Sequence, residues 1–159
     1  MKRLIQLKGK RADLLALFAG LLLPLSLAPF YLYPLAIVSL TMLFLLWLHL
    51  EPKQAFRRGW FFGLGMFGFG ISWVYVSVRY FGGASVPLAL FLTALTVSLY
   101  ALFPAVLGYL ALYLLRWYRG NEERYLFIEL ILLLPGLWGM MEWVRGWLFT
   151  GNPWLNTAY

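Results

Sequence analysis

The chain has 159 residues, of which 63% are hydrophobic and 12% are charged, and its mean hydropathy is +0.78. A soluble domain carries about 25% charged residues, so this composition argues against an ordinary water-soluble globule and indicates a protein surrounded mostly by lipid. The net charge of +7 does not indicate nucleic-acid binding, because the basic residues fall in short runs between apolar segments. The chain has no cysteine, which excludes disulfides, thiolate metal sites and a cysteine nucleophile within it.

Five apolar segments follow one another along the chain. A bilayer core of about 30 Å needs about 20 helical residues to cross it. Four segments reach or approach that length, and the second, with 17 residues, is at the lower limit. We therefore predict an all-α, polytopic membrane helix bundle with about five transmembrane helices. The segments are Ala12–Phe30, Pro34–Leu50, Gly59–Arg79, Leu88–Leu115 and Tyr125–Leu148.

The basic residues predict how these segments are oriented. Eleven of the 13 Lys and Arg residues lie before the first segment, between the second and third, or between the fourth and fifth. If all five segments span, these residues face one side, which the positive-inside rule assigns to the cytoplasm. We therefore expect a cytoplasmic N-terminus and a C-terminal stretch, TGNPWLNTAY, on the outer side.

The first segment also has features of a cleaved signal peptide, with a basic start and small residues at Ser26 and Ala28. Pro29 would follow the cut, and the apolar run is long, so an uncleaved anchor is favoured. Prolines also lie in or beside the later segments. Because membrane helices tolerate proline, we expect kinks rather than helix ends at these residues: Pro24, Pro87, Pro104 and Pro135.

Glycines are frequent in the third segment. Gly63, Gly65 and Gly68 match the spacing G-x-G-x-x-G. The dinucleotide fingerprint requires a preceding strand and a βαβ unit, and this match lies inside an apolar segment, so we reject the nucleotide interpretation. Gly59 and Gly63 form a small-xxx-small step, which lets helix backbones approach closely.

Aromatic residues gather where the third segment reaches its outer end. The stretch SWVYVSVRYFGG covers residues 72–83 and contains Trp73, Tyr75, Tyr80 and Phe81. Trp and Tyr at a helix end usually form an interfacial belt. The alternative is that these residues line a lipid-headgroup site at the outer surface.

A charge pair lies near the outer end of the fifth segment. Glu142 and Arg145 are three residues apart and therefore share one helix face. Ionisable groups in a membrane segment are candidate functional residues, but a structural pair that fixes this helix to a neighbour is an equal alternative. Indole side chains, whose faces suit lipid or cationic headgroups, surround the pair: Trp138, Trp143, Trp147 and Trp154.

No catalytic set can be assembled from the remaining polar residues. His49 is the only histidine, lies at the end of an apolar segment and is expected to be solvated. Neither a Ser-His-acid set nor a metal cluster is formed. We therefore assign no catalytic residue, metal or cofactor to this chain.

Three stretches together resemble the N-terminal membrane region of bacterial apolipoprotein N-acyltransferases. They are LAPFYLYPLAIVSL (27–40), SWVYVSVRYFGG (72–83) and LWGMMEWVRGWLFTGNPWLNTAY (137–159). The third is the most specific, because Glu-Trp-x-Arg-Gly-Trp is followed by Thr-Gly-x-Pro-Trp-Leu. This sequence departs from the family at Asn152, where Phe is expected, and at Ala158, where Gly is expected. The departures affect the expected local headgroup contacts.

The resemblance implies an enzyme of the bacterial inner membrane. Such an enzyme transfers an acyl chain from a phospholipid, typically phosphatidylethanolamine, to the N-terminal cysteine amine of a diacylglyceryl lipoprotein. The family uses a nitrilase-like domain outside the membrane, with a Cys nucleophile, a Glu base and a Lys that stabilises the oxyanion. Residues 1–159 would then be the transmembrane domain of a larger protein, with a periplasmic C-terminal end. Without a cysteine this chain alone is expected to be inactive.

The resemblance also implies contacts on the substrate side of the membrane domain. Arg145 would pair with a lipid phosphate, and Trp154 would form one side of the entrance for the acyl chain. The alternative is a complete small integral membrane protein without catalysis, such as a scaffold or transport subunit. The residues expected to contact substrate are Tyr75, Phe81, Glu142, Arg145, Trp147 and Trp154.

Overall fold

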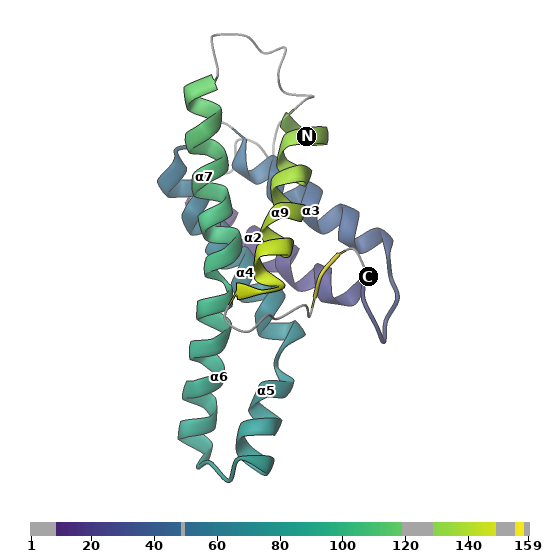
Figure 1. The fold of residues 1–159 in the computed structure, drawn as a ribbon, viewed down its shortest axis with the longest axis vertical. Coiled ribbons are helices and arrows are strands. Elements are labelled where there is room, and N and C mark those ends of the chain that lie inside the picture. The colour runs from purple at the N-terminus through teal and green to yellow at the C-terminus, as the bar shows by residue number, and fades with distance from the viewer. Residues whose placement is uncertain (1–8, 49, 119–128, 149–154, 158–159) are drawn as a thin grey trace.

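The computed structural model describes residues 9–48, 50–118, 129–148 and 155–157, and every regular element in these ranges is a helix. The all-α prediction is therefore confirmed (Figure 1). The elements are α2 (Lys10–Leu25), α3 (Pro34–Trp47), α4 (Pro52–Gly70), α5 (Trp73–Val76), the π-helix η1 (Ser77–Phe81), α6 (Val86–Tyr100), α7 (Leu102–Tyr118), the π-helix η3 (Glu129–Leu133) and α9 (Leu134–Arg145).

One described helix is long and apolar enough to cross a bilayer. It is the continuous run of α6 and α7, Val86–Arg116, with 31 residues, and only 11% of its most apolar window is buried. The bent pair formed by α4 and Trp73–Phe81, at an angle of 52°, adds at most one more span. The five-span prediction is not confirmed, because α2, α3 and α9 have 16, 14 and 12 residues, fewer than the roughly 20 that a span needs.

Proline marks helix ends more often than expected. Pro87 and Pro135 lie in the first turn of α6 and α9, and Pro24 is the penultimate residue of α2. The predicted kinks were wrong at Pro24 and Pro87, which lie at helix ends, whereas Pro135 lies where η3 continues directly into α9. Proline suits the first turn because its missing N–H would have no intrahelical acceptor there and its φ is already helical. Pro104 alone lies inside the long α6–α7 helix.

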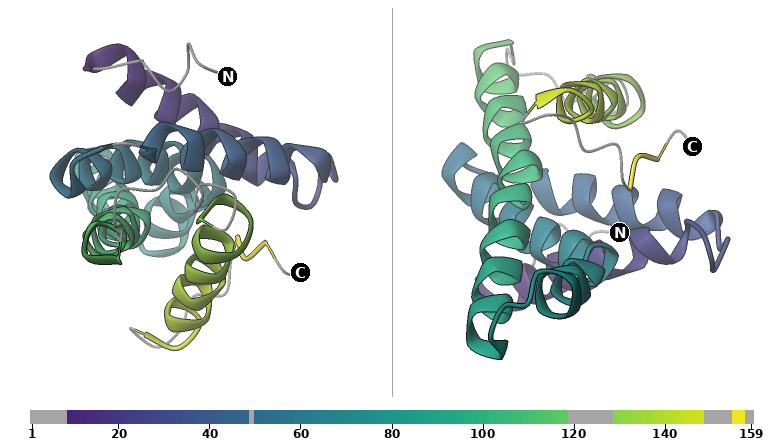
Figure 2. Two further views of the ribbon diagram at one scale, coloured as in Figure 1. Left: turned by 90° about the horizontal axis from the view of Figure 1, so that it is seen from above. Right: turned by 60° about the horizontal axis from the view of Figure 1, so that its bottom comes forward.

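The central helix α4 packs between α2 and α7 (Figures 1 and 2). Gly63 lies directly against α6–α7, since a Cβ added to it would be 2.6 Å from the Cα of Ala101. On the α2 side, a Cβ at Gly65 would be 2.1 Å from the carbonyl oxygen of Leu17. The packing role predicted for Gly63 is confirmed, and Gly65 has the same role towards α2, because both contacts are backbone approaches that only glycine permits.

The basic ends of three helices meet at one end of this core. Arg57 of α4 and Asp13 of α2 form an ion pair at 3.0 Å. Arg116, near the end of α7, pairs with Glu51, which precedes α4. These contacts place the start of α2, the start of α4 and the end of α7 together, as the alternating arrangement of the first, third and fourth predicted segments requires.

The opposite end of the long helix forms a hairpin. In Figure 1, α5 and α6 project together below the other helices. The connection between η1 and α6 is held by Arg79, whose Nη1 donates to the carbonyl oxygen of Ala84 at 3.0 Å. Large aromatic side chains are exposed here, with Tyr80 72% and Phe81 87% accessible.

Candidate functional site

A buried polar cluster lies on the inner face of α9. Trp138, Glu142 and Arg145 are 2%, 5% and 0% exposed. They occupy positions i, i+4 and i+7 of the helix, which share one face. The prediction that Glu142 and Arg145 lie on one helix face is therefore confirmed, and that face points into the protein.

The Glu142 carboxylate accepts several hydrogen bonds. The indole Nε1 of Trp138 donates to Oε1 at 2.8 Å, and the backbone N–H of Thr157 donates to the same oxygen at 2.9 Å. The hydroxyl of Thr157 lies 2.9 Å from Oε2 and 3.0 Å from Oε1. A buried carboxylate is tolerated only when its oxygens are well bonded, so Thr157 is part of what allows Glu142 to be buried.

Arg145 makes its contacts with different groups. Its Nη2 donates to the side-chain oxygen of Asn156. Its guanidinium carbon lies 5.3 Å from the ring centroid of Phe67 in α4, a cation–π distance. Both Glu142 and Arg145 therefore hydrogen-bond to residues 155–157, here called the C-terminal segment.

The C-terminal segment is also anchored by its first residue. Leu155 has a φ of 63°, a left-handed conformation that is uncommon for a leucine. Its side chain fills the space beside Gly70 at the end of α4, where an added Cβ would lie 2.3 Å from Leu155 Cδ1. The segment thus joins the end of α4 to the buried face of α9.

The predicted substrate contacts fall into separate groups. Glu142 and Arg145 lie together in the buried cluster, whereas Trp147 is 57% exposed and stacks edge-to-face on Trp143 at 5.6 Å. Tyr75 is half-buried in α5, and Phe81 ends η1 in the projecting hairpin (Figure 1). Phe81 therefore lies apart from the buried polar cluster of α9. Two residues singled out from the sequence, Trp154 and His49, lie outside the described residues.

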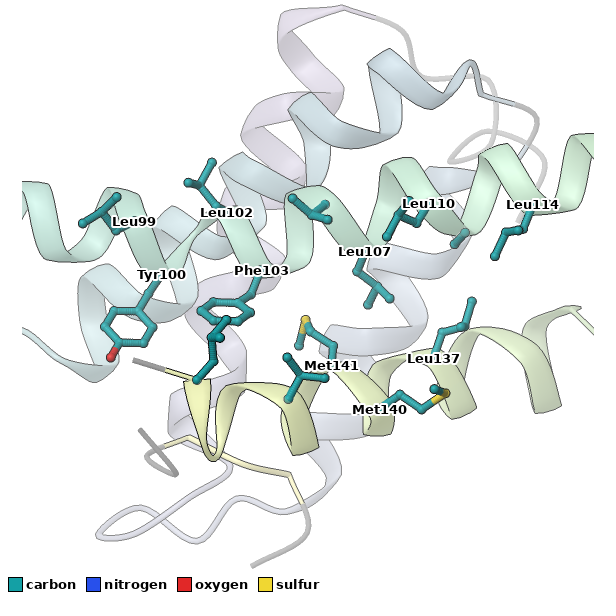
Figure 3. Close-up of a pocket in the computed structure, with 14 residues that line it drawn as sticks. Leu99, Tyr100, Leu102, Phe103, Leu107, Leu110, Leu114, Leu137, Met140 and Met141 are labelled. Atoms are coloured by element: carbon teal, nitrogen blue, oxygen red, sulfur yellow. The ribbon is translucent and has the colours of Figure 1, made fainter. Parts of the chain in front are cut away.

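An apolar groove runs between α7 and α9 and was not predicted from the sequence. It has a volume of about 660 Å³, and Figure 3 shows Tyr100 towards one end and Leu114 at the other. From Leu99 to Leu114 the groove follows about 22 Å of helix. Its lining is apolar apart from the Tyr100 hydroxyl, which suits an aliphatic chain: Leu99, Tyr100, Leu102, Phe103, Val106, Leu107, Leu110, Ala111, Leu114, Leu137, Met140, Met141, Val144 and Leu148.

The partners of the charged pair were also not predicted from the sequence. Asn156 and Thr157 are 11 and 15 residues away from Arg145 and Glu142, so no helical spacing connects them. The available signal was chemical, because two buried charges need polar partners and the C-terminal stretch offers an amide and a hydroxyl. Among the described residues, no group of three or more His, Cys, Asp or Glu side chains is placed to hold a metal ion.

The helices and the site define an all-α protein with one strongly apolar, largely exposed long helix and a buried polar cluster beside it. The chain belongs to the apolipoprotein N-acyltransferase family. The family model described as the apolipoprotein N-acyltransferase N-terminal domain matches residues 19–159.

Individual relatives agree with this assignment. The chain is 44% identical over 149 residues to the apolipoprotein N-acyltransferase of Methylococcus capsulatus, which covers 94% of this chain and 28% of the relative. It is 44% identical over 147 residues to that of Coxiella burnetii, covering 92% and 29%. For the Pseudomonas syringae protein the identity is 43% over 157 residues, covering 99% and 30%. The chain therefore spans less than a third of these relatives.

Proposed function

We propose that this chain is the membrane-embedded N-terminal part of an apolipoprotein N-acyltransferase. The whole enzyme would transfer an acyl chain from a membrane phospholipid to the N-terminal cysteine amine of a diacylglyceryl lipoprotein. The observation that carries this proposal is the family match over residues 19–159. The exposed apolar surface of α6–α7 supports the membrane setting, because a largely unburied helix of this composition needs lipid around it.

We place the chain in a bacterial inner membrane with its basic end in the cytoplasm. The ion pairs of Arg57 and Arg116 support this, since they gather the basic ends of three helices on one side. The hairpin and the C-terminal segment then face the periplasm. Five spans remain the expected topology of this region.

Within the proposed domain, the six site residues have two roles. Tyr75, Phe81, Trp147 and Trp154 would contact lipid, since aromatic side chains favour the headgroup region. Glu142 and Arg145 would position the C-terminal segment, in which Leu155 directly follows Trp154. Their burial supports this division, because a lipid phosphate cannot reach a guanidinium that is 0% exposed without displacing its neighbours.

The chemistry itself requires a nucleophile from elsewhere. This chain has no cysteine and would not acylate a lipoprotein alone. A chimera tests the proposal: these 159 residues joined to the remaining C-terminal part of the Methylococcus capsulatus relative. We expect the membrane-inserted chimera to acylate a diacylglyceryl lipoprotein and the chain alone to give none. A folded, inserted but inactive chimera would favour a non-enzymatic membrane protein. Activity of the chain alone would contradict the proposal that the nucleophile comes from outside these 159 residues.

A further inference from the structure

A second, smaller cavity lies near the basic end of the molecule, between α4 and α7. It has a volume of about 310 Å³ and is lined by Lys53, Phe56, Val106 and Tyr109. Lys53 is exposed in the first turn of α4, and Phe56 is half-buried one turn later. Val106 and Tyr109 come from α7 and are 45% and 37% exposed. The cavity therefore combines one ammonium group, two aromatic rings and an aliphatic side chain.

The charge on Lys53 is available to a ligand. Of the two ion pairs within the described residues, one uses Arg57 and the other Arg116, and Lys53 belongs to neither. The acid closest to it in sequence is Glu51, which Arg116 already engages. Within the described ranges no ion pair with a carboxylate neutralises the ammonium, and the cavity favours an anion.

The surroundings of the cavity are those of a membrane interface. Tyr109 and Tyr113 stack with their ring centroids 6.3 Å apart on the exposed side of α7, and tyrosine is enriched at the headgroup level. Val106 lines both this cavity and the apolar groove between α7 and α9. The smaller cavity, which is mostly apolar but carries the Lys53 ammonium, therefore adjoins the apolar groove, and this pairing matches a molecule with a charged head and an aliphatic tail.

We propose that this cavity binds the headgroup of an anionic glycerophospholipid from the cytoplasmic leaflet. The Lys53 ammonium would pair with the phosphate, the Tyr109 hydroxyl would donate to a phosphate or glycerol oxygen, and one acyl chain would enter the groove beside Val106. Basic pockets between membrane helices on the cytoplasmic side are suited to such headgroups. The proposal rests on the membrane placement given above, but it concerns the end of the molecule opposite the hairpin.

The test compares lipid preference in matched variants. The 159-residue chain is placed in nanodiscs of phosphatidylcholine, or of phosphatidylcholine with phosphatidylglycerol, and its melting temperature and retained lipids are measured by fluorescence and native mass spectrometry. We expect phosphatidylglycerol to raise the melting temperature and to be retained selectively. Lys53→Gln should weaken phosphatidylglycerol retention about five-fold, which corresponds to about 1 kcal/mol, and Lys53→Arg should keep it.

Lys10→Gln is the matched control, because it removes one exposed positive charge outside the cavity. We expect this variant to keep the preference for phosphatidylglycerol, and Tyr109→Phe to reduce it. Equal losses in Lys10→Gln and Lys53→Gln would mean that diffuse net charge binds the lipid, and the proposal would be wrong. An inserted wild-type chain without a phosphatidylglycerol preference would also overturn it while leaving the proposed function intact. Failure to insert into either nanodisc would contradict both.

Discussion

The backbone N–H of Thr157 lies 2.9 Å from the Glu142 carboxylate, and this hydrogen bond ties the C-terminal segment to α9. The contact joins residues 15 positions apart across the end of a helix. It is reinforced by the Thr157 hydroxyl and by Arg145, whose guanidinium bonds to Asn156. Two adjacent residues of the segment are thus held by two side chains of one helix face.

The first prediction concerns this cluster. Glu142→Ala leaves the Trp138 indole and the Thr157 N–H without their acceptor, and each buried unsatisfied group costs about 1–3 kcal/mol. We expect a clear fall in the melting temperature of the chain in detergent, followed by tryptophan fluorescence. Glu142→Gln keeps one carbonyl acceptor and should lose less. The exposed Glu51→Gln should cost at most about 1 kcal/mol, and an equal loss there would contradict a special role for Glu142.

The second prediction concerns the contact between α4 and α6–α7. Gly63→Ala adds a methyl group at 2.6 Å from the Ala101 Cα, so the helices must separate. We expect a loss of about 1–3 kcal/mol, typical of overpacking, and a larger loss for Gly63→Leu. The control in the same helix is Gly68→Ala, where the nearest atom, Val97 Cγ1, is 3.9 Å away. That change should stabilise the helix by up to about 1 kcal/mol. A similar response of the two variants would show that Gly63 does not set the helix distance.

The third prediction concerns topology. A reporter fused after Tyr159 is expected on the periplasmic side, and one fused after Arg119 on the cytoplasmic side, because basic residues are retained inside. Paired reporters active in opposite compartments measure this directly. Finding both fusions on one side would be incompatible with a crossing between these positions.

The fourth prediction separates positioning from substrate binding at Arg145. In the chimera, Arg145→Ala removes the contacts with Asn156 and Phe67 and leaves Glu142 buried. We therefore expect the melting temperature to fall, while the protein that remains folded keeps its acylation rate. The double change Glu142→Gln with Arg145→Gln restores neutral side chains that can hydrogen-bond, and we expect it to recover most of the activity. A well-folded double variant that forms the acyl-enzyme slowly would instead show that Arg145 binds the donor phosphate.

The helices could be predicted from the sequence because apolar composition and glycine spacing are local signals. The Gly63 contact and the shared face of Glu142 and Arg145 both follow from helical periodicity. The bend after Gly70 and the hydrogen bonds of Asn156 and Thr157 depend on where distant elements meet, and no periodicity encodes that. The apolar groove was missed for a related reason, since leucines that line a cavity and leucines that face lipid have the same spacing.

The length of the α6–α7 helix has a consequence for the surface of the membrane. Its 31 residues extend over about 46 Å, whereas the hydrocarbon core is about 30 Å thick. Even at a tilt of about 40°, the upper end of the usual range, the helix would still rise about 35 Å along the membrane normal. A few ångströms at least must therefore stand outside the hydrocarbon. With the inner boundary between Tyr109 and Arg116, part of the excess falls on the hairpin, which would hold Tyr80 and Phe81 above the acyl chains, among the outer headgroups.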